Sequence, residues 1–480
     1  MKGDKKTKLG TVRKANGEYT TTPEETLEEL LRVLFPNSTG EDQYNNPTED
    51  MDAITNEEYL NIKNMINSDS VKAAIRSFKP YKSPGPDGIY PVLIQQGIEE
   101  LTPYLIETYT NSIKIKRPAH TWLKTKAVFI PKPGKPDYMD PKAYRPISLS
   151  FFVLKGLERL IHWHLLDTNL KEKPLPKNLY SYREGMSTET ALHQTISKIE
   201  STLENNEIAI VIFLDISGAF SEASIQGMMK SLEKRNINGQ LRDWISHMLE
   251  NRKVTVHMGE SNVTKELNRG TPQGGILSPP IFNIDIEDCL SRIPEKGPTE
   301  GHGYADDLKA IGTGIDENAI AANIQRDLKN LEEWAAENSL AFSPSKTKAM
   351  LFTRKKNITK PEIFIHGVAI EYVQEFKYLG VIIDEKLNWR KHIENQTRKA
   401  QIALSTSRKM IGTKWGLKPK QTEWIYKGIV RPILTYGSIV WVNSLEKKYV
   451  RKALEKIQRT ACLMMTGAMR STPNKVWKCC

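Results

Sequence analysis

Cysteine is scarce in this sequence, and long apolar runs are missing. The 480 residues include four cysteines and no CxxC pair, which argues against a disulfide scaffold or a Cys-rich zinc site and favours a reducing compartment. No run approaches the roughly 18–20 apolar residues that a membrane-spanning helix needs. The basic, polar start MKGDKKTKLG is not followed by the apolar segment of a secretory signal. We therefore expect a soluble, intracellular protein of the nucleus or the cytoplasm, with no membrane partner.

Acidic residues are also scarce in one region, and this makes the charge distribution uneven. Residues 386–460 hold 18 Lys and Arg against four Glu and no Asp, although the whole chain has a net charge of only +12. A basic surface concentrated in one region favours a polyanionic partner such as nucleic acid. The alternative is an ordinary solvated helical face, and charge alone does not separate the two interpretations.

The order of helix and strand patterns predicts a mixed fold. A chain of this length suggests about two to four domains. Strand and helix patterns alternate through the middle, and a hairpin is predicted at Gly303–Ile311, which together indicate an α+β domain with an antiparallel sheet. Other predicted strands include Ile208–Asp215, Arg252–His257 and Tyr378–Ile383. The predicted helices include Glu24–Phe35 and three basic amphipathic helices at roughly 389–411, 418–434 and 446–465.

Two acidic sites stand out within this pattern. The apolar run IVIFLD ends in Asp215, and the sequence GYADD places Asp306 and Asp307 side by side. Three converging carboxylates repel one another unless cations lie between them, and Mg²⁺ prefers such oxygen ligands together with substrate phosphates. Two ions about 3.5–4 Å apart would suit an in-line phosphoryl transfer. Each site alone is better explained as an ordinary turn or strand end, but together they favour a metal site.

A glycine-flanked amide lies between the two acidic sites. It is Gln273, in the segment RGTPQGGILSP, where glycines would let a base pair and the backbone approach closely. An ordinary strand-to-helix turn is the alternative. In their order along the chain, FLDISGAF, RGTPQGGILSP and GYADD resemble the A, B and C motifs of a reverse transcriptase.

The flanking segments narrow this resemblance to the polymerases of non-LTR retrotransposons, closest to the jockey-like and I-like insect elements. The similar blocks are SPGPDGI (83–89), FIPKPGKPDYMDPKAYRPISL (129–149), YREGMSTETAL (182–192), FSPSKTKAMLF (342–352) and FKYLGVIID (376–384). The helical region 415–473 also resembles the part that follows the polymerase core in those elements. The similarity covers about residues 70–473.

The resemblance implies an RNA-directed DNA polymerase with an α+β, right-hand fold of fingers, a ferredoxin-like antiparallel palm and a helical thumb. It divides the chain into an N-terminal linker or remnant (1–69), fingers and the start of the palm (70–205), the palm with the catalytic motifs (206–385), a basic helical thumb or connection (386–473) and an unstructured tail (474–480). The implied partners are an RNA template, a DNA primer, the RNA–DNA hybrid and dNTPs. The implied cofactor is Mg²⁺, as two ions, for which Mn²⁺ could substitute. The oligomeric state stays open.

The resemblance also implies roles for individual residues. The metal ligands would be Asp215, Asp306, Asp307 and the backbone carbonyl of Ile216. The residues implied to contact the nucleotide are Lys132 and Arg145 at the triphosphate, Ile216, Phe220 against a 2′-OH, and Gln273 at the incoming nucleotide. The residues implied for the end of the reaction and for the primer are Lys346, as proton donor to pyrophosphate, and Tyr378, Leu379 and Gly380, as the primer grip. A plain core phenylalanine and a plain loop lysine are the alternatives for Phe220 and Lys346.

Some features depart from the family pattern. Many relatives carry Asp where this chain has Ser221, a position outside the metal triad. We see no endonuclease domain before the polymerase, since residues 1–69 are too short for one, and no RNase H domain or zinc knuckle after it. The alternative to an active enzyme is therefore a catalytically inactive relic that only binds RNA or RNA–DNA hybrid.

Overall fold

The apolar run Ile208–Asp215 forms β3, the middle strand of a five-stranded sheet with the order β11-β8-β3-β7-β6. The structure, a computed structural model, describes residues 10–36, 55–294, 297–356, 358–411 and 415–473. The partners of β3 in this sheet are β6 (Thr299–Tyr304), β7 (Asp307–Gly314), β8 (Lys348–Phe352) and β11 (Glu371–Tyr372). All pairings are antiparallel except that of the edge strand β11 with β8. The predicted antiparallel sheet is therefore present, with one parallel edge.

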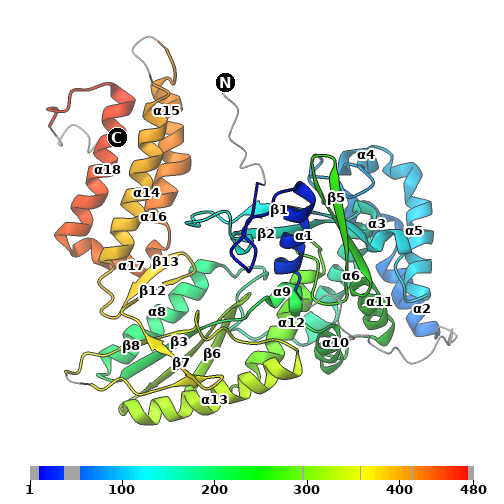
Figure 1. Cartoon of the computed structure of the whole chain (residues 1–480), viewed down its shortest axis with the longest axis horizontal. Helices are drawn as coiled ribbons and strands as arrows, with labels where there is room; N and C mark the ends of the chain where they lie inside the picture. Colours follow the sequence, from blue (N-terminus) through cyan, green and yellow to red (C-terminus); the bar gives the residue numbers. More distant parts are fainter. Residues whose placement is uncertain (1–9, 37–54, 295–296, 357, 412–414, 474–480) are drawn as a thin grey trace.

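Both faces of β3 are buried, which explains why its sequence is apolar throughout. The elements that cover the faces are α8 (Thr188–Glu204), α10 (Ile225–Lys234), α12 (Ser278–Leu290), α13 (Glu317–Glu337) and the hairpin of β12 (Glu375–Tyr378) with β13 (Val381–Asp384). Ile210 and Ile212 share one core with α10, α12 and α13, whereas Val211 and Phe213 pack with α8 and the hairpin. The end of β3 is thus held from both sides (Figure 1).

A second sheet has the order β2-β1-β4-β5 and carries the N-terminal helix. Its strands are β1 (Lys124–Pro131), β2 (Tyr144–Leu149), β4 (Arg252–Met258) and β5 (Ser261–Leu267). The predicted helix near residue 24 is confirmed as α1 (Pro23–Leu34), and its Leu27 and Leu31 pack against the apolar side chains of this sheet. Arg13 also donates its backbone N–H to Met139 O at 2.7 Å. Residues 10–36, assigned from the sequence to an upstream linker or remnant, are thus packed on the second sheet.

This packing predicts a stability effect at Leu30, which is fully buried on α1 beside Ala143 and Tyr144. Leu30→Ala should lower the free energy of unfolding by about 2–5 kcal/mol, the usual cost of truncating a buried leucine. Urea denaturation would measure it. Glu28→Ala, an exposed change on the same helix, is the control and should stay within about 0.5 kcal/mol of the unsubstituted chain. Equal stability of the two variants would mean that α1 is not part of the folded unit.

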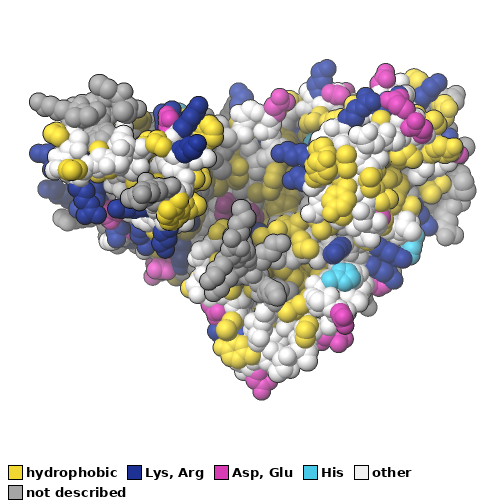
Figure 2. Space-filling view, turned by 90° about the horizontal axis from the view of Figure 1, so that it is seen from above, with side chains coloured by type: hydrophobic (Ala, Val, Ile, Leu, Met, Phe, Trp, Pro, Cys, Tyr) yellow, Lys and Arg dark blue, Asp and Glu magenta, His cyan; other side chains and the backbone are white. Residues whose placement is uncertain are grey.

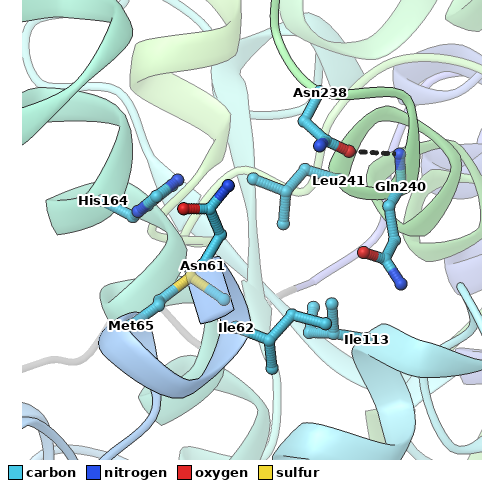
Figure 3. A pocket seen from close by; sticks show the side chains of 8 residues that line it. All are labelled: Asn61, Ile62, Met65, Ile113, His164, Asn238, Gln240 and Leu241. Carbon is cyan, nitrogen blue, oxygen red and sulfur yellow. Dashed lines mark hydrogen bonds between the residues drawn. The ribbon is translucent and has the colours of Figure 1, made fainter. Parts of the chain in front are cut away.

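Helices form a third group beside the second sheet (Figure 1). They are α2 (Asn56–Met65), α3 (Ser68–Arg76), α4 (Pro91–Gln96), α5 (Ile98–Lys114), α6 (Phe152–Asp167), α7 (Asn169–Glu172) and α11 (Gly239–Leu249), with a 3₁₀ turn at His120–Leu123. The short helix α9 (Ala219–Glu222) lies instead against α12, and a 3₁₀ turn at Pro141–Ala143 lies against α1. A cavity of about 30 Å³ lies among α2, α5, α6 and α11, lined in part by Asn61, His164 and Gln240 (Figure 3). This volume suits about two or three water molecules, at roughly 10–15 Å³ each, and not an organic ligand.

The C-terminal region is a helical bundle beside the β12–β13 hairpin (Figure 1). Its elements are α14 (Arg390–Arg408), α15 (Pro419–Ile425), a π-helical turn (Tyr426–Val430), α16 (Arg431–Thr435), α17 (Ser438–Trp441), a 3₁₀ turn (Val442–Glu446) and α18 (Lys448–Thr466). The predicted helix at 418–434 is confirmed as a continuous helical segment, Pro419–Thr435, with a π-helical turn at Tyr426–Val430. Figure 2 shows the molecule hollowed between this bundle and the rest, with Lys and Arg side chains on both sides of the hollow.

The prediction of one strand at Tyr378–Ile383 is wrong: Leu379 and Gly380 have φ values of 43° and 86° and turn the chain between β12 and β13. A small hairpin joins β9 (Phe364–Ile365) and β10 (Val368–Ala369). The tail predicted at 474–480 lies outside the described residues. Within the described ranges, every helix is too short or too polar to cross a bilayer.

Candidate active site

The three aspartates meet at one end of the five-stranded sheet. Asp215 is the last residue of β3 and Asp307 the first of β7, and the two are directly paired in the antiparallel register. Opposite residues of such a pair have Cα atoms about 4.5–5.5 Å apart and side chains on the same face. Asp306 lies in the turn just before Asp307, where Ala305 takes the left-handed conformation with φ 55°. The structure therefore places Asp215 opposite Asp307 and next to the turn that carries Asp306, and their joint role as metal ligands stays a prediction.

Asp306 and Asp307 are exposed residues, but the surrounding protein and mutual repulsion still disfavour their ionised forms. Partial desolvation raises the pKa of Asp306, and the nearby charge of Asp215 raises it further, while Arg145 and Lys346 act in the opposite direction. Partial desolvation also raises the pKa of Asp307 to about 6, and the charges of Asp306 and Asp215 add to this. A cation placed among the three carboxylates would relieve this repulsion.

Lys346 is the cation that this structure places at the site. Its Nζ lies 2.8 Å from Asp215 Oδ2, across 131 residues of sequence. Ser343, three residues earlier, donates its backbone N–H to Asp215 O at 2.9 Å and so fixes the loop that carries the lysine. Lys346 thus lies beside Asp215, and its role as a proton donor stays a prediction.

The donor chemistry fits a hard cation, because all three side chains are carboxylates. Within the described residues, however, no three His, Cys, Asp or Glu side chains are arranged closely enough to hold a metal ion. Asp215 is engaged by Lys346 instead. A cation that binds this Oδ2 atom would have to displace the lysine. The carbonyl of Ile216 is a predicted ligand. Ile216 lies just beyond β3 and forms an isolated antiparallel β-bridge with Phe342.

The predicted triphosphate residues lie at the end of the second sheet, Arg145 on β2 and Lys132 in the loop just after β1. The charge of Arg145 lowers the pKa of Asp306, although less than partial desolvation raises it. Lys132 donates from Nζ to Lys142 O at 2.9 Å. Burial lowers the pKa of Lys132, and the charges of Lys135, Arg145 and Lys346 lower it further. The charges of Arg145 and Lys346 lower both the pKa of Lys132 and that of Asp306. Lys132, Arg145 and Lys346 therefore form one basic side of the site.

Phe220 and the glycine-flanked loop are joined to each other. The Phe220 ring on α9 stacks on Phe282 of α12, with ring centroids 4.3 Å apart. Thr271 donates its N–H to Phe220 O at 2.8 Å. A Cβ on Gly270, which has φ +66°, would lie only 2.3 Å from the same oxygen, so only glycine allows this approach. Gln273 O in turn accepts the Ser148 N–H from β2 at 2.8 Å.

The predicted primer-grip residues form the turn of the β12–β13 hairpin, which is tied to two regions. Tyr378 is 2% exposed, and its hydroxyl accepts a hydrogen bond from Lys309 Nζ at 3.1 Å. Leu379 O accepts from the hydroxyl of Tyr436, in the helical bundle, at 2.8 Å. A Cβ on Gly380 would lie 2.9 Å from the Tyr436 ring. The hairpin thus links the five-stranded sheet to the bundle.

Sequence reasoning missed two buried charged residues near this site, Lys309 and Glu158. Lys309 is 1% exposed on β7, contacts the Thr195 hydroxyl and lies 4.6 Å from the centre of the Tyr378 ring. Burial lowers the pKa of Lys309 to about 7. Glu158 is 1% exposed on α6. The available signal was a charged residue inside an otherwise apolar strand or helix.

The chain belongs to the reverse transcriptase (RNA-dependent DNA polymerase) family, whose model matches residues 130–383. Members of this family are generally metal-dependent. The resemblance to non-LTR retrotransposon polymerases is confirmed by the individual relatives described next.

Three insect proteins are similar over most of this chain. The probable RNA-directed DNA polymerase from transposon BS of Drosophila melanogaster is 26% identical over 84% of this chain and 44% of its own length. The RNA-directed DNA polymerase from mobile element jockey of Drosophila funebris is 28% identical over 81% of this chain and 44% of its own length. The Pol polyprotein of the R1 retrotransposable element of Bradysia coprophila is 26% identical over 93% of this chain and 43% of its own length. This chain thus spans less than half the length of these relatives.

A solved structure of telomerase from Candida albicans, in complex with a fragment of telomeric RNA, is also similar. Its TM-score is 0.36 at 14% sequence identity, and the match covers 78% of this chain and 63% of that one.

Proposed function

We propose that this chain is an RNA-directed DNA polymerase of a non-LTR retrotransposon, which extends a primer 3′-OH with dNTPs on an RNA template. The observation that carries the proposal is the register pair of Asp215 with Asp307, with Asp306 in the adjoining turn. Family membership and the insect relatives support it. In this proposal residues 70–205, which include β1 and β2, form the fingers and the start of the palm. Residues 206–385, which include the catalytic end of the five-stranded sheet, form the palm, and the bundle (386–473) forms the thumb or connection.

The proposed metal ligands are Asp215, Asp306, Asp307 and the Ile216 carbonyl, which would hold two Mg²⁺ ions or, in substitution, Mn²⁺. When bound, these ions would lower the pKa of the primer 3′-OH and stabilise charge on the triphosphate. Release of Lys346 from Asp215 would free its ammonium group to donate a proton to the leaving pyrophosphate.

The remaining residues bind and orient the substrates. Lys132 and Arg145 would neutralise the triphosphate, since Arg145 already lowers the pKa of the neighbouring Asp306. Phe220 would exclude a 2′-OH, and Gln273 would contact the incoming nucleotide. The turn of Tyr378, Leu379 and Gly380 would hold the primer end.

The basic helical bundle would bind the duplex through its phosphates. Residues 386–460 carry 18 Lys and Arg against four Glu, and the bundle borders the hollow seen in Figure 2. Binding through phosphates is independent of base sequence and weakens steeply with salt, which suits an RNA–DNA hybrid recognised by shape.

Primer extension on poly(rA)/oligo(dT) tests the proposal. The chain should incorporate dTTP in the presence of Mg²⁺, and excess EDTA should abolish the incorporation. Poly(rA)/oligo(dT) binding, measured at the same salt concentration, provides the control for a folded protein. Tight, salt-sensitive binding without extension would contradict the proposal and favour the inactive relic that only binds RNA or hybrid.

A further inference from the structure

Glu158 is a buried carboxylate that none of the roles above uses. It lies on α6, 1% exposed, among helix residues that pack in the core, such as Leu157 and Ile161. Its Oε2 accepts the backbone N–H of Ile276 at 3.3 Å. Burial raises the pKa of Glu158 to about 7, and the hydrogen bond from Ile276 opposes this effect most, followed by the charge of Lys155. Burying a carboxylate costs free energy unless the group is hydrogen-bonded, and the hydrogen bond from Ile276 offsets part of this cost.

The partner of Glu158 is the segment just before α12, whose Ile276 N–H donates to the carboxylate. The residue before α12 is Leu277, whose side chain makes no capping hydrogen bond. Pro279 and Pro280, the second and third residues of the helix, have no N–H for an ordinary capping side chain to bind. The Leu277 N–H also lowers the pKa of Glu158. Glu158 therefore holds, from α6, the backbone that leads into α12.

The loop before α12 is held on its other side by β2. Ser148 donates its N–H to Gln273 O at 2.8 Å. Gly274 has φ +128°, and a Cβ there would lie 2.6 Å from Ser148 O. A Cβ on Gly275 would lie 3.2 Å from Glu158 Oε1. The loop 273–277 is thus enclosed between β2 and the Glu158 carboxylate, with no room for side chains at its two glycines.

We propose that Glu158 is a positioning residue that fixes the loop 273–277 and thereby places Gln273 against the incoming dNTP. This inference rests on the proposed polymerase function, because it concerns the nucleotide site of that reaction. Glu158 does not touch the nucleotide; it acts through the Ile276 and Leu277 amides. Its loss should therefore weaken dNTP binding and leave the chemical step and duplex binding nearly unchanged.

The test is steady-state primer extension with variants of Glu158 in the full chain. Glu158→Leu removes the acceptor and should raise the KM for dTTP about tenfold or more, as loss of a charged hydrogen bond does, with kcat within about threefold. Glu158→Gln keeps one oxygen acceptor in the same shape and should stay within about threefold of the unsubstituted KM. Asp327→Asn, a buried acid on α13 that is 1% exposed, is the matched control and should leave both constants unchanged.

A shorter acid keeps the test valid if the leucine variant does not fold. Glu158→Asp retains the charge but falls about one methylene short of Ile276, and it should raise the KM for dTTP by about fivefold. An unchanged KM in Glu158→Asp or in folded Glu158→Leu would overturn the inference, as would a fall in kcat alone. If the unsubstituted chain does not extend primers, the polymerase proposal fails instead. Amide hydrogen exchange at Ile276 and Leu277 would then still decide whether Glu158 holds the loop, since equal exchange in all variants refutes it.

Discussion

Asp306→Asn should reduce primer extension on poly(rA)/oligo(dT) by roughly 100- to 1,000-fold or more, the range seen when one group that stabilises transition-state charge is removed. The residue lies in the turn beside the Asp215–Asp307 pair, where the three carboxylates would share the cations of the reaction. Asparagine keeps the shape but removes the charge that attracts those cations. The measurement is kcat at saturating dTTP and Mg²⁺.

The stability of Asp306→Asn should be equal to or higher than that of the unsubstituted chain, although its activity falls. Partial desolvation and the charge of Asp215 raise the pKa of Asp306, so its ionised form costs folding free energy at a pH above that raised value, and this cost is small because the residue is exposed to solvent. A neutral asparagine does not carry this cost. We therefore expect the melting temperature of Asp306→Asn to be equal to or above that of the unsubstituted chain, which excludes unfolding as the reason for lost activity.

Asp316→Asn provides the matched control for the same chemical change. Asp316 is the N-cap of α13 and accepts the N–H of Asn318 at 3.0 Å, a role that asparagine performs equally well. This variant should keep full activity. Retention of more than a tenth of the activity by Asp306→Asn would contradict the proposed metal site.

Phe220→Ala should increase the use of rNTPs relative to dNTPs by about 10- to 200-fold, the range of discrimination that a small steric feature of a pocket provides. The ring is held by stacking on Phe282 at 4.3 Å, and the bond from Thr271 to Phe220 O fixes its backbone. Such an immobile ring can exclude a 2′-OH by shape alone. The measurement is the ratio of kcat/KM for UTP to that for dTTP.

This ratio is insensitive to loss of folded protein, because both substrates are tested on the same preparation. Phe220→Tyr keeps the ring and should keep the exclusion. Equal use of rNTPs by the unsubstituted chain and by Phe220→Ala would show that the sugar-gate assignment is wrong. Efficient rNTP use by both would favour an RNA-templated RNA polymerase instead.

Local patterns predicted the elements that depend on local interactions. The apolar run before Asp215 became a strand with both faces buried, and the leucine spacing near residue 24 became α1. The prediction failed at Tyr378–Ile383. One long strand and two short strands joined by an apolar turn have the same pattern of apolar residues, so the pattern does not distinguish them. Leu379 takes a positive φ there, and a pattern of side-chain polarity carries no signal for this.

Contacts between distant segments were not predictable in the same way. Glu158 and Lys309 are charged residues whose partners lie 118 and 69 residues away, at Ile276 and Tyr378. The sequence shows such a residue within an apolar element but not the group that satisfies it. The N-terminal segment had too weak a pattern to indicate that it packs on the second sheet.

By itself, the sequence determined that Asp215 follows an apolar run and that Asp306 and Asp307 stand side by side. It also determined where the positive charge gathers and which family the motifs indicate, since periodicity, composition and motif order are properties of the chain alone. Tertiary structure decided that Asp307 lies opposite Asp215, that Lys346 pairs with Asp215 and that Glu158 holds the loop at Ile276. The physical reason is that each of these contacts joins segments some 90 to 130 residues apart, and its geometry is set by how whole elements pack against one another.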